Sequence, residues 1–181
     1  MKWQTLALTF LTSTGLASPI TQRDPAKVYA LRLVSKTPSL NGKYLGAKGQ
    51  AVGVYKDPAQ AVKFFPVPST EGLYELHRYP SVGQDEQHAL ALVGAESHGL
   101  LDLADLVNPA ATEFPKGTKV DWNSFTLDKE SKSVEYAGAA GGRWAAFPSG
   151  NNGEWSVKWK DPSAITIDVY MPVTVVYEEV E

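Results

Sequence analysis

Short runs of alternating apolar and polar residues, separated by frequent turn residues, constrain the fold of this chain more than any other feature. The runs Val28–Val34, 73–77 and 165–169 alternate with a period of two, and Trp155 and Trp159 keep the same period. The 181 residues include 12 prolines and 15 glycines, which interrupt every longer run. This pattern is typical of all-β sandwiches and barrels.

A weak internal repeat favours one kind of barrel. Three Gly-Ala dipeptides each follow a strand-like run, and their glycines are 48 and 44 residues apart: Gly46-Ala47, Gly94-Ala95 and Gly138-Ala139. After each dipeptide come a second apolar run and then an aromatic segment. A unit of about 45 residues used three times, with four strands in each, is the pattern of a β-trefoil. We therefore expect a β-trefoil-like barrel of about twelve short strands, with a β-sandwich as the alternative.

The ends and the composition predict an exported single domain. Residues 1–17 combine a basic start, a short apolar run and small residues before Ser18, which is the pattern of a signal peptide. We expect residues 18–27 to be an extended segment and residues 28–181 to be one all-β domain. No later segment reaches the length of a membrane span. The balance of 17 basic and 20 acidic residues argues against nucleic acid as a partner.

An exported chain without cysteines must be held together by packing alone. The sequence contains no cysteine, although secreted proteins of this size often use disulfides. About 164 residues would remain after export, enough for one hydrophobic core. We therefore expect most of the large aromatic side chains to lie inside.

The segment 89–107 resembles the nucleophile elbow of serine hydrolases. Residues 90–93 read as a strand and Leu100–Val107 as the one plausible helix, or alternatively as two apolar turns, with Ser97 between them. A hydrolase of that class needs its histidine after the serine in chain order. Beyond the adjacent His98, no histidine follows Ser97. The sequence therefore argues against this activity.

Other catalytic and cofactor chemistry has little support in the sequence. The histidines lack the spacing of metal ligands, and no cofactor motif is present, so we expect no cofactor and no metal. Paired carboxylates for glycoside hydrolysis meet in space rather than in sequence, so that alternative stays open. We expect a protein that is not an enzyme.

A ligand-binding surface is predicted around one tryptophan and one loop. Trp144 and Arg143 follow a glycine-rich turn, and Asn151 and Asn152 lie in a polar hairpin loop at 149–154. An exposed aromatic ring in this setting can stack on a sugar. These four residues are the candidate ligand-binding surface.

The other tryptophans are expected to lie in the core. A buried indole ring removes 150–250 Å² from water, which a core without disulfides needs. We expect Trp122 and Trp155 to be internal. Trp155 and Trp159, four residues apart on a strand, should share one internal face.

The order of aromatic motifs resembles the PhiA-like family of fungal secreted cell-wall proteins. The resemblance covers most of the chain after the signal and rests on the runs 73–76 (Leu-Tyr-Glu-Leu), 122–127 (Trp-Asn-Ser-Phe-Thr-Leu), 134–136 (Val-Glu-Tyr), 144–147 (Trp-Ala-Ala-Phe), 154–159 (Glu-Trp-Ser-Val-Lys-Trp) and 173–177 (Val-Thr-Val-Val-Tyr). It implies a noncatalytic, extracellular or wall-associated protein of a filamentous fungus.

These observations together predict a secreted, noncatalytic, β-rich protein of the fungal cell wall or surface that binds carbohydrate. Its expected partner is a cell-wall polysaccharide or an extracellular protein. The alternative is a secreted protease inhibitor or effector-type binding protein that presents loop 149–154. A secreted hydrolase is the remote alternative.

Overall fold

The computed structural model describes residues 27–56, 61–79, 87–150 and 153–180. The predicted signal peptide, 1–17, lies outside the described residues, as does the segment 18–27 except for Lys27. In the part of the chain that the structure describes, no helix is long and apolar enough to cross a membrane.

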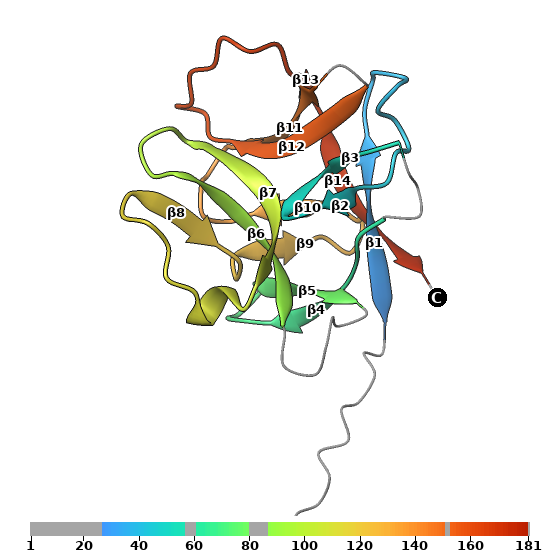
Figure 1. Ribbon diagram of the computed structural model, residues 1–181. Helices are drawn as coiled ribbons and strands as arrows, with labels where there is room; N and C mark the ends of the chain where they lie inside the picture. Colours follow the sequence, from blue (N-terminus) through green and yellow to red (C-terminus); the bar gives the residue numbers. More distant parts are fainter. Residues whose placement is uncertain (1–26, 57–60, 80–86, 151–152, 181) are drawn as a thin grey trace, which may run out of the picture.

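The described residues form an all-β structure, as the alternating runs predict (Figure 1). A short 3₁₀ turn, η2, covers Pro109–Ala111. The fourteen strands of the sheet are β1 (Val28–Val34), β2 (Gly46–Lys48), β3 (Ala51–Val54), β4 (Lys63–Pro68), β5 (Tyr74–Tyr79), β6 (His88–Ala95), β7 (Leu100–Val107), β8 (Thr118–Asp121), β9 (Phe125–Leu127), β10 (Val134–Tyr136), β11 (Arg143–Ser149), β12 (Glu154–Lys160), β13 (Met171–Pro172) and β14 (Thr174–Val180).

Six of these strands follow one another around a nearly closed, barrel-like sheet, and we call these six strands the ring. Strand β1 pairs with β4, β4 with β5, β5 with β9, and β9 with β10, all antiparallel. An isolated bridge between Ser133 and Val176 links the start of β10 to β14. Strand β14 returns to β1 along seven paired residues, from Val28–Val180 to Val34–Thr174. The first and last strands of the described chain are therefore neighbours.

Six of the remaining strands form three hairpins that pair with one another. The hairpins are β2–β3, β6–β7 and β11–β12. Strand β3 pairs with both β7 and β12, and β12 also pairs with β7, so each hairpin contacts the other two. Along β1 the partner changes from β4, at Tyr29, to the segment 43–45 that leads into β2–β3. The hairpins and the start of β1 therefore lie toward opposite ends of the ring.

One hydrophobic core fills the ring and continues beneath the hairpins. It contains leucine and valine side chains from many of the strands and six buried aromatic side chains, three of which pack together. Trp159 packs edge-to-face against both Trp144 and Tyr136, with ring centres 5.2 and 5.7 Å apart. The core thus uses the large rings that a protein without disulfides is expected to bury.

Two segments differ from the local prediction. Leu100–Val107 is strand β7 rather than a helix, because its backbone pairs with β6 and β12. The alternating run 165–169 is not a strand. Strand β13 pairs with Ala145 and Ala146 of β11, and two residues further on β11 is Pro148, which offers no N–H to extend the pairing.

The Gly-Ala repeat matches the hairpins only in part. Gly46-Ala47 and Gly94-Ala95 both lie in the first strand of a hairpin, close to its turn. Gly138-Ala139 lies before β11, so a whole strand separates it from the corresponding turn. The third dipeptide is therefore not equivalent to the other two.

The close approach of β3 and β12 makes Gly53 sensitive to substitution. A Cβ atom at this position would overlap the backbone carbonyl of Trp155. We expect Gly53→Ala to lower the free energy of unfolding by about 1–3 kcal/mol, because two backbones would have to separate. Urea unfolding measures this, with Ala51→Ser at the exposed start of β3 as the control. Equal stability of the two variants would contradict the close packing.

Candidate functional site

The prediction that Trp144 lies on the surface is wrong. Its side chain is 2% exposed, and its indole N–H donates a hydrogen bond of 2.5 Å to the carbonyl of Val134. Trp144 belongs to the main core, where its ring packs edge-to-face against Trp159. Arg143, one residue earlier, is exposed as expected. Asn151 and Asn152 lie outside the described residues, so no binding surface centres on Trp144.

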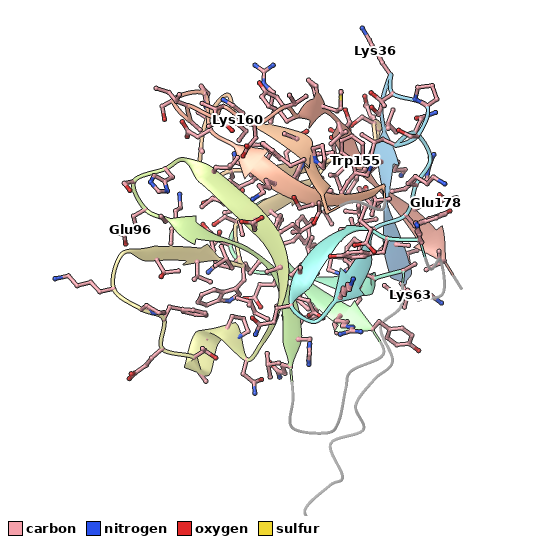
Figure 2. The ribbon with its side chains drawn as sticks, turned by 45° about the horizontal axis from the view of Figure 1, so that its top comes forward. Lys36, Lys63, Glu96, Trp155, Lys160 and Glu178 are labelled. Carbon is pink, nitrogen blue, oxygen red and sulfur yellow. The ribbon has the colours of Figure 1, made fainter. Side chains whose placement is uncertain are left out.

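The other tryptophans follow the core prediction to different degrees. Trp159 is 2% exposed and belongs to the main core. Trp155, labelled in Figure 2, is half-buried against the same core. Trp122 is half-buried against a smaller cluster formed by Ala91, Ala104 and Leu106. None of these four indoles is among the exposed large hydrophobic side chains of the described residues.

The segment resembling a nucleophile elbow is a hairpin turn. Ser97 and His98 lie between β6 and β7, and the His98 N–H donates to the carbonyl of Ala95 across the turn. Figure 2 places Glu96 at the tip of this hairpin, pointing away from the body of the protein. The strand-to-helix geometry of a hydrolase elbow is therefore not formed at Ser97.

A buried carboxylate ties three strands together. Asp105 of β7 is 2% exposed; it accepts a 2.6 Å hydrogen bond from Arg78 of β5, and its other oxygen lies 3.0 Å from Nδ1 of His88 of β6. The Asp105 N–H donates to the carbonyl of Gln50. These contacts satisfy a charge that would be costly to bury alone. We assign the cluster a structural role.

The best candidate binding site is a groove at the end of the ring away from the hairpins. It has a volume of about 750 Å³. We call it the mouth groove. At this end it is lined by side chains from six segments: Tyr29 of β1, Pro66 of β4, Tyr74 of β5, Leu127 of β9, the turn residues Lys129, Ser131 and Lys132 before β10, and Tyr177 of β14. The lining continues along the paired strands β1 and β14, with Arg32, Val34, Val176, Glu178 and Glu179, and also includes Lys27.

Aromatic side chains form the floor of the mouth groove. Tyr29 and Tyr74 are half-buried and pack against the main core, which leaves part of each ring facing the groove. Tyr177 is 9% exposed and meets the Tyr29 ring edge-on, with centres 5.3 Å apart. Burial raises the pKa of Tyr177, so its hydroxyl stays protonated and donates to the carbonyl of Asp128.

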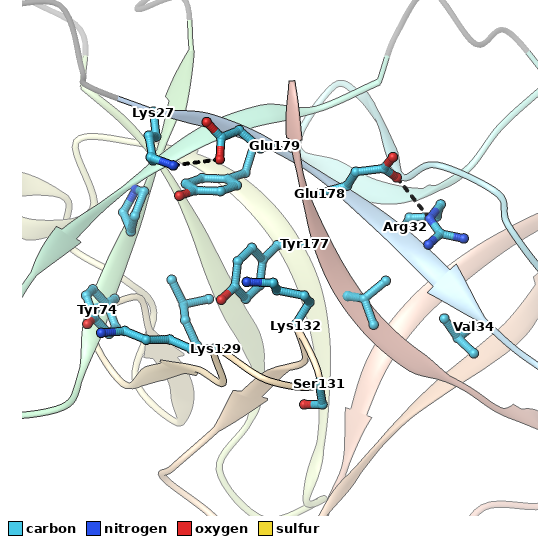
Figure 3. Close-up of a pocket in the computed structure, with 14 residues that line it drawn as sticks. Lys27, Arg32, Val34, Tyr74, Lys129, Ser131, Lys132, Tyr177, Glu178 and Glu179 are labelled. Atoms are coloured by element: carbon cyan, nitrogen blue, oxygen red, sulfur yellow. Dashed lines mark hydrogen bonds and ion pairs between the residues drawn. The ribbon is translucent and has the colours of Figure 1, made fainter. Parts of the chain in front are cut away.

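The turn between β9 and β10 brings two ammonium groups to the rim. The Asp128 carboxylate accepts hydrogen bonds from the backbone N–H groups of Glu130 and Ser131 and from the Ser131 hydroxyl. Figure 3 shows the two lysines of this turn, Lys129 and Lys132, extending over the groove floor. The Lys132 ammonium lies 5.7 Å from the centre of the Tyr177 ring.

The geometry of this turn is set locally. Lys132 has a φ of 59°, in the left-handed region, and its carbonyl accepts a hydrogen bond from the Tyr177 N–H. Hydrogen bonding from the Ser131 backbone lowers the pKa of Asp128 from its ordinary 3.8. The Asp128 contribution to stability is therefore present above that value and is lost as the pH falls through the lowered pKa. At neutral pH the turn is held in place.

Each of the two carboxylates that line the groove forms an ion pair with a cationic side chain. Glu179 pairs with Lys27 at 2.8 Å, and Glu178 pairs with Arg32 at 3.1 Å. As neighbours on β14 they point to opposite sides of the strand, as Figure 3 shows. Glu178 also accepts a hydrogen bond from the Tyr44 hydroxyl. The pair is not arranged as two carboxyl groups facing one substrate.

The mouth groove therefore combines partly exposed aromatic rings with a surplus of positive charge. Four cationic side chains line it against the two glutamates. Among the described residues, neither Lys129 nor Lys132 forms an ion pair, so their ammonium groups can bind an external anion. Sequence reasoning missed this site because its residues come from separate strands and carry no local motif. Only their positions at strand ends could have suggested it.

Comparisons with protein-family models, curated proteins and solved structures find no match to this chain.

The buried position of Trp144 is testable by paired substitutions. We expect Trp144→Ala to lower the free energy of unfolding by about 3–5 kcal/mol through lost packing. Trp144→Phe keeps a ring but leaves the Val134 carbonyl unpaired, at a cost of about 1–3 kcal/mol. Denaturant unfolding measures both, and Arg143→Ala should change stability by less than about 0.5 kcal/mol. A neutral Trp144→Ala would show that the indole is not in the core.

The Asp105 cluster predicts a second, independent loss of stability. Arg78→Ala removes the charge-assisted hydrogen bond to a buried carboxylate and should cost roughly 1.5–3 kcal/mol. The matched control is Lys63→Ala, which removes an exposed cation from the neighbouring strand β4. Thermal unfolding of the two variants separates the effects. If both lower Tm equally, Asp105 does not depend on Arg78.

Proposed function

We propose that this chain is a secreted, noncatalytic binding protein of the fungal cell wall, and that it holds polysaccharide in the mouth groove. The observation that carries the proposal is the meeting of three tyrosines and two lysines without an ion pair at one end of the ring. Secretion and wall association rest on the signal-like residues 1–17 and on the resemblance to PhiA-like proteins.

The shape and lining of the groove support a saccharide as ligand. Its volume of about 750 Å³ lies within the usual range of ligand sites, and the half-buried rings of Tyr29 and Tyr74 give it an apolar floor. A sugar ring presents an apolar face and a rim of hydroxyl groups. The first can pack on tyrosine and the second can hydrogen-bond to ammonium and carboxylate groups.

The charge of the groove favours an acidic saccharide. Lys129 and Lys132 each offer three N–H donors without a carboxylate partner among the described residues. Charge-assisted hydrogen bonds to carboxylate or phosphate are shorter and stronger than those to neutral hydroxyls. The proposed ligand is a glycan that carries carboxylate or phosphate groups.

A noncatalytic role fits the positions of the groove carboxylates. Glycoside hydrolysis requires two carboxyl groups on either side of one bond. Glu178 and Glu179 point to opposite sides of β14, and each is engaged by a cation. Binding without bond cleavage is therefore the simpler use of this surface.

We further propose that the barrel is a β-trefoil. A β-trefoil joins a six-stranded barrel to three hairpins that pack together at one end. The ring β1–β4–β5–β9–β10–β14 and the mutual pairing of hairpins β2–β3, β6–β7 and β11–β12 support this interpretation. The mouth groove would then occupy the end of the barrel that the hairpins leave open.

Affinity electrophoresis with defined polymers tests the proposed function. We expect retardation by polygalacturonate, which carries carboxylates, or by phosphomannan, which carries phosphates. Retardation by the uncharged polymers chitin and β-glucan should be weaker. Lys129→Ala should weaken binding about tenfold, the value of one charge-assisted hydrogen bond. Tyr74→Ala should weaken binding by a comparable factor, because one of the aromatic rings in the floor of the mouth groove is lost.

The matched control is Lys36→Ala, which removes an exposed lysine outside the groove, at the far end of β1 (Figure 2). Polygalacturonate and phosphomannan distinguish a carboxylate from a phosphate ligand. Equal weakening by Lys36→Ala and Lys129→Ala would indicate nonspecific charge attraction and overturn the site. Absence of binding to any of the polymers would overturn the function.

A further inference from the structure

The loop between β12 and β13 exposes three large aliphatic side chains. Ile165 is 94% exposed, Ile167 98% and Val169 71%. In Figure 1 this loop, residues 161–170, projects from the hairpin end of the molecule as a wide arch. β-Branched side chains gathered on one projecting segment are typical of an interaction surface.

Both feet of the arch are anchored. The Lys160 ammonium donates a 2.6 Å hydrogen bond to the carbonyl of Ala164, a residue that is 7% exposed. At the other foot the Tyr170 ring packs against Phe147, with ring centres 5.4 Å apart. Between these anchors Ile165 and residues 167–169 are exposed, and Thr166 is half-buried. The exposure of its side chains is therefore built into the fold rather than caused by a frayed end.

Residues 165–169 have the composition of a β-strand but do not pair with a neighbouring strand of the described chain. Ile165, Ile167 and Val169 alternate with Thr166 and Asp168, the period of a half-buried β-strand. Within the arch, the Asp168 N–H donates to the Thr166 hydroxyl at 3.1 Å, at a bend in the backbone. No backbone–backbone hydrogen bond joins the described residues 165–170 to a neighbouring strand.

We propose that residues 165–169 pair with the same residues of a second copy of this chain, as an antiparallel ribbon with its two-fold axis at Ile167. In this register Ile167 faces Ile167, and Ile165 faces Val169. All the aliphatic side chains then share one face. On the other face, the Thr166 hydroxyl of each copy lies opposite the Asp168 carboxylate of the other and can donate a hydrogen bond to it.

The self-complementary pattern favours a second copy over other partners. A two-fold interface requires each residue to face a compatible residue under the symmetry, and the five-residue segment meets this requirement in both its apolar and its polar positions. An anionic lipid surface is disfavoured, because Asp168 lies within the exposed segment and the chain carries a net charge of −3. Pairing straightens the bend at Asp168 and exchanges its local hydrogen bond for one across the ribbon.

The absence of cysteine makes the register directly measurable. The chain contains no cysteine, so a single introduced thiol reports one position without background. Residues directly opposite in an antiparallel pair have Cα atoms at a separation that a disulfide accepts. We expect Ile167→Cys to form a disulfide-linked dimer under mild oxidation. Ile165→Cys alone should not, because its symmetry mate lies about 13 Å away along the ribbon.

A mixture completes the register test. Ile165→Cys and Val169→Cys, each unreactive alone, should give a cross-linked heterodimer when combined. Cross-linking of all three single variants to equal extent would show random collision and overturn the register.

The unmodified chain provides the test of association itself. Sedimentation equilibrium should show a concentration-dependent dimer, and Ile167→Asp should raise its dissociation constant at least tenfold. Lys36→Asp, which introduces the same side chain at another exposed position, should leave it unaltered. A monomer at every concentration would overturn the proposal. So would a monomer that floats with phosphatidylcholine–phosphatidylserine vesicles in an Ile167-dependent manner, which would assign the arch to lipid.

Discussion

The pairing between the first and last strands is the interaction on which the rest of this structure depends. Strand β14 aligns with β1 over seven residues on one side. Its preceding residues 171–172 pair with β11, and Val176 bridges to Ser133 before β10. With no disulfide available, these backbone hydrogen bonds and the packing beneath them are what hold the two ends of the described chain together. Separation of β1 from β14 would expose both the core and a long strand edge.

The core and the mouth groove are two consequences of the same ring. Every strand that joins the ring turns one set of alternate side chains inward. In the middle of the ring these side chains are Leu31, Phe64 and Leu76, which are fully buried. At the end away from the hairpins the inward positions hold Tyr29, Tyr74 and Tyr177, and the lysines of the turn before β10 lie beside them. A groove with both apolar and polar partners therefore forms where the core ends.

Local patterns predicted strands well where a neighbour was available to pair. Val28–Val34 is a strand as expected, because β14 and β4 supply partners on both sides. The run 165–169 alternates as clearly but is not a strand, since the pairing of β13 with β11 stops short of it. Leu100–Val107 shows the converse case. Its apolar residues suit a helix, but its backbone forms hydrogen bonds with the adjacent strands β6 and β12 instead.

Site residues were harder to predict than strands, because exposure depends on neighbours distant in sequence. Trp144 beside a glycine-rich turn has the local features of a surface aromatic. Its indole is nevertheless buried, because it packs against Trp159 in the main core and the Val134 carbonyl accepts its N–H. Lys129 and Lys132 have the local features of an ordinary polar turn, and Tyr74 those of an ordinary strand residue. The ring places them beside Tyr29 and Tyr177, which belong to the two ends of the described chain.

The sequence by itself determined that the described chain is all-β, that it has no disulfide, and that its aromatic residues fill a core. These properties follow from alternation, turn residues and composition, which act over a few residues at a time. The tertiary structure alone decided which strands become neighbours, which tryptophans are covered, and where a groove opens. The physical reason is that many strands pair with segments distant in sequence, so the environment of a side chain depends on partners that local patterns do not reveal, such as Tyr29 and Glu179, which are 150 residues apart.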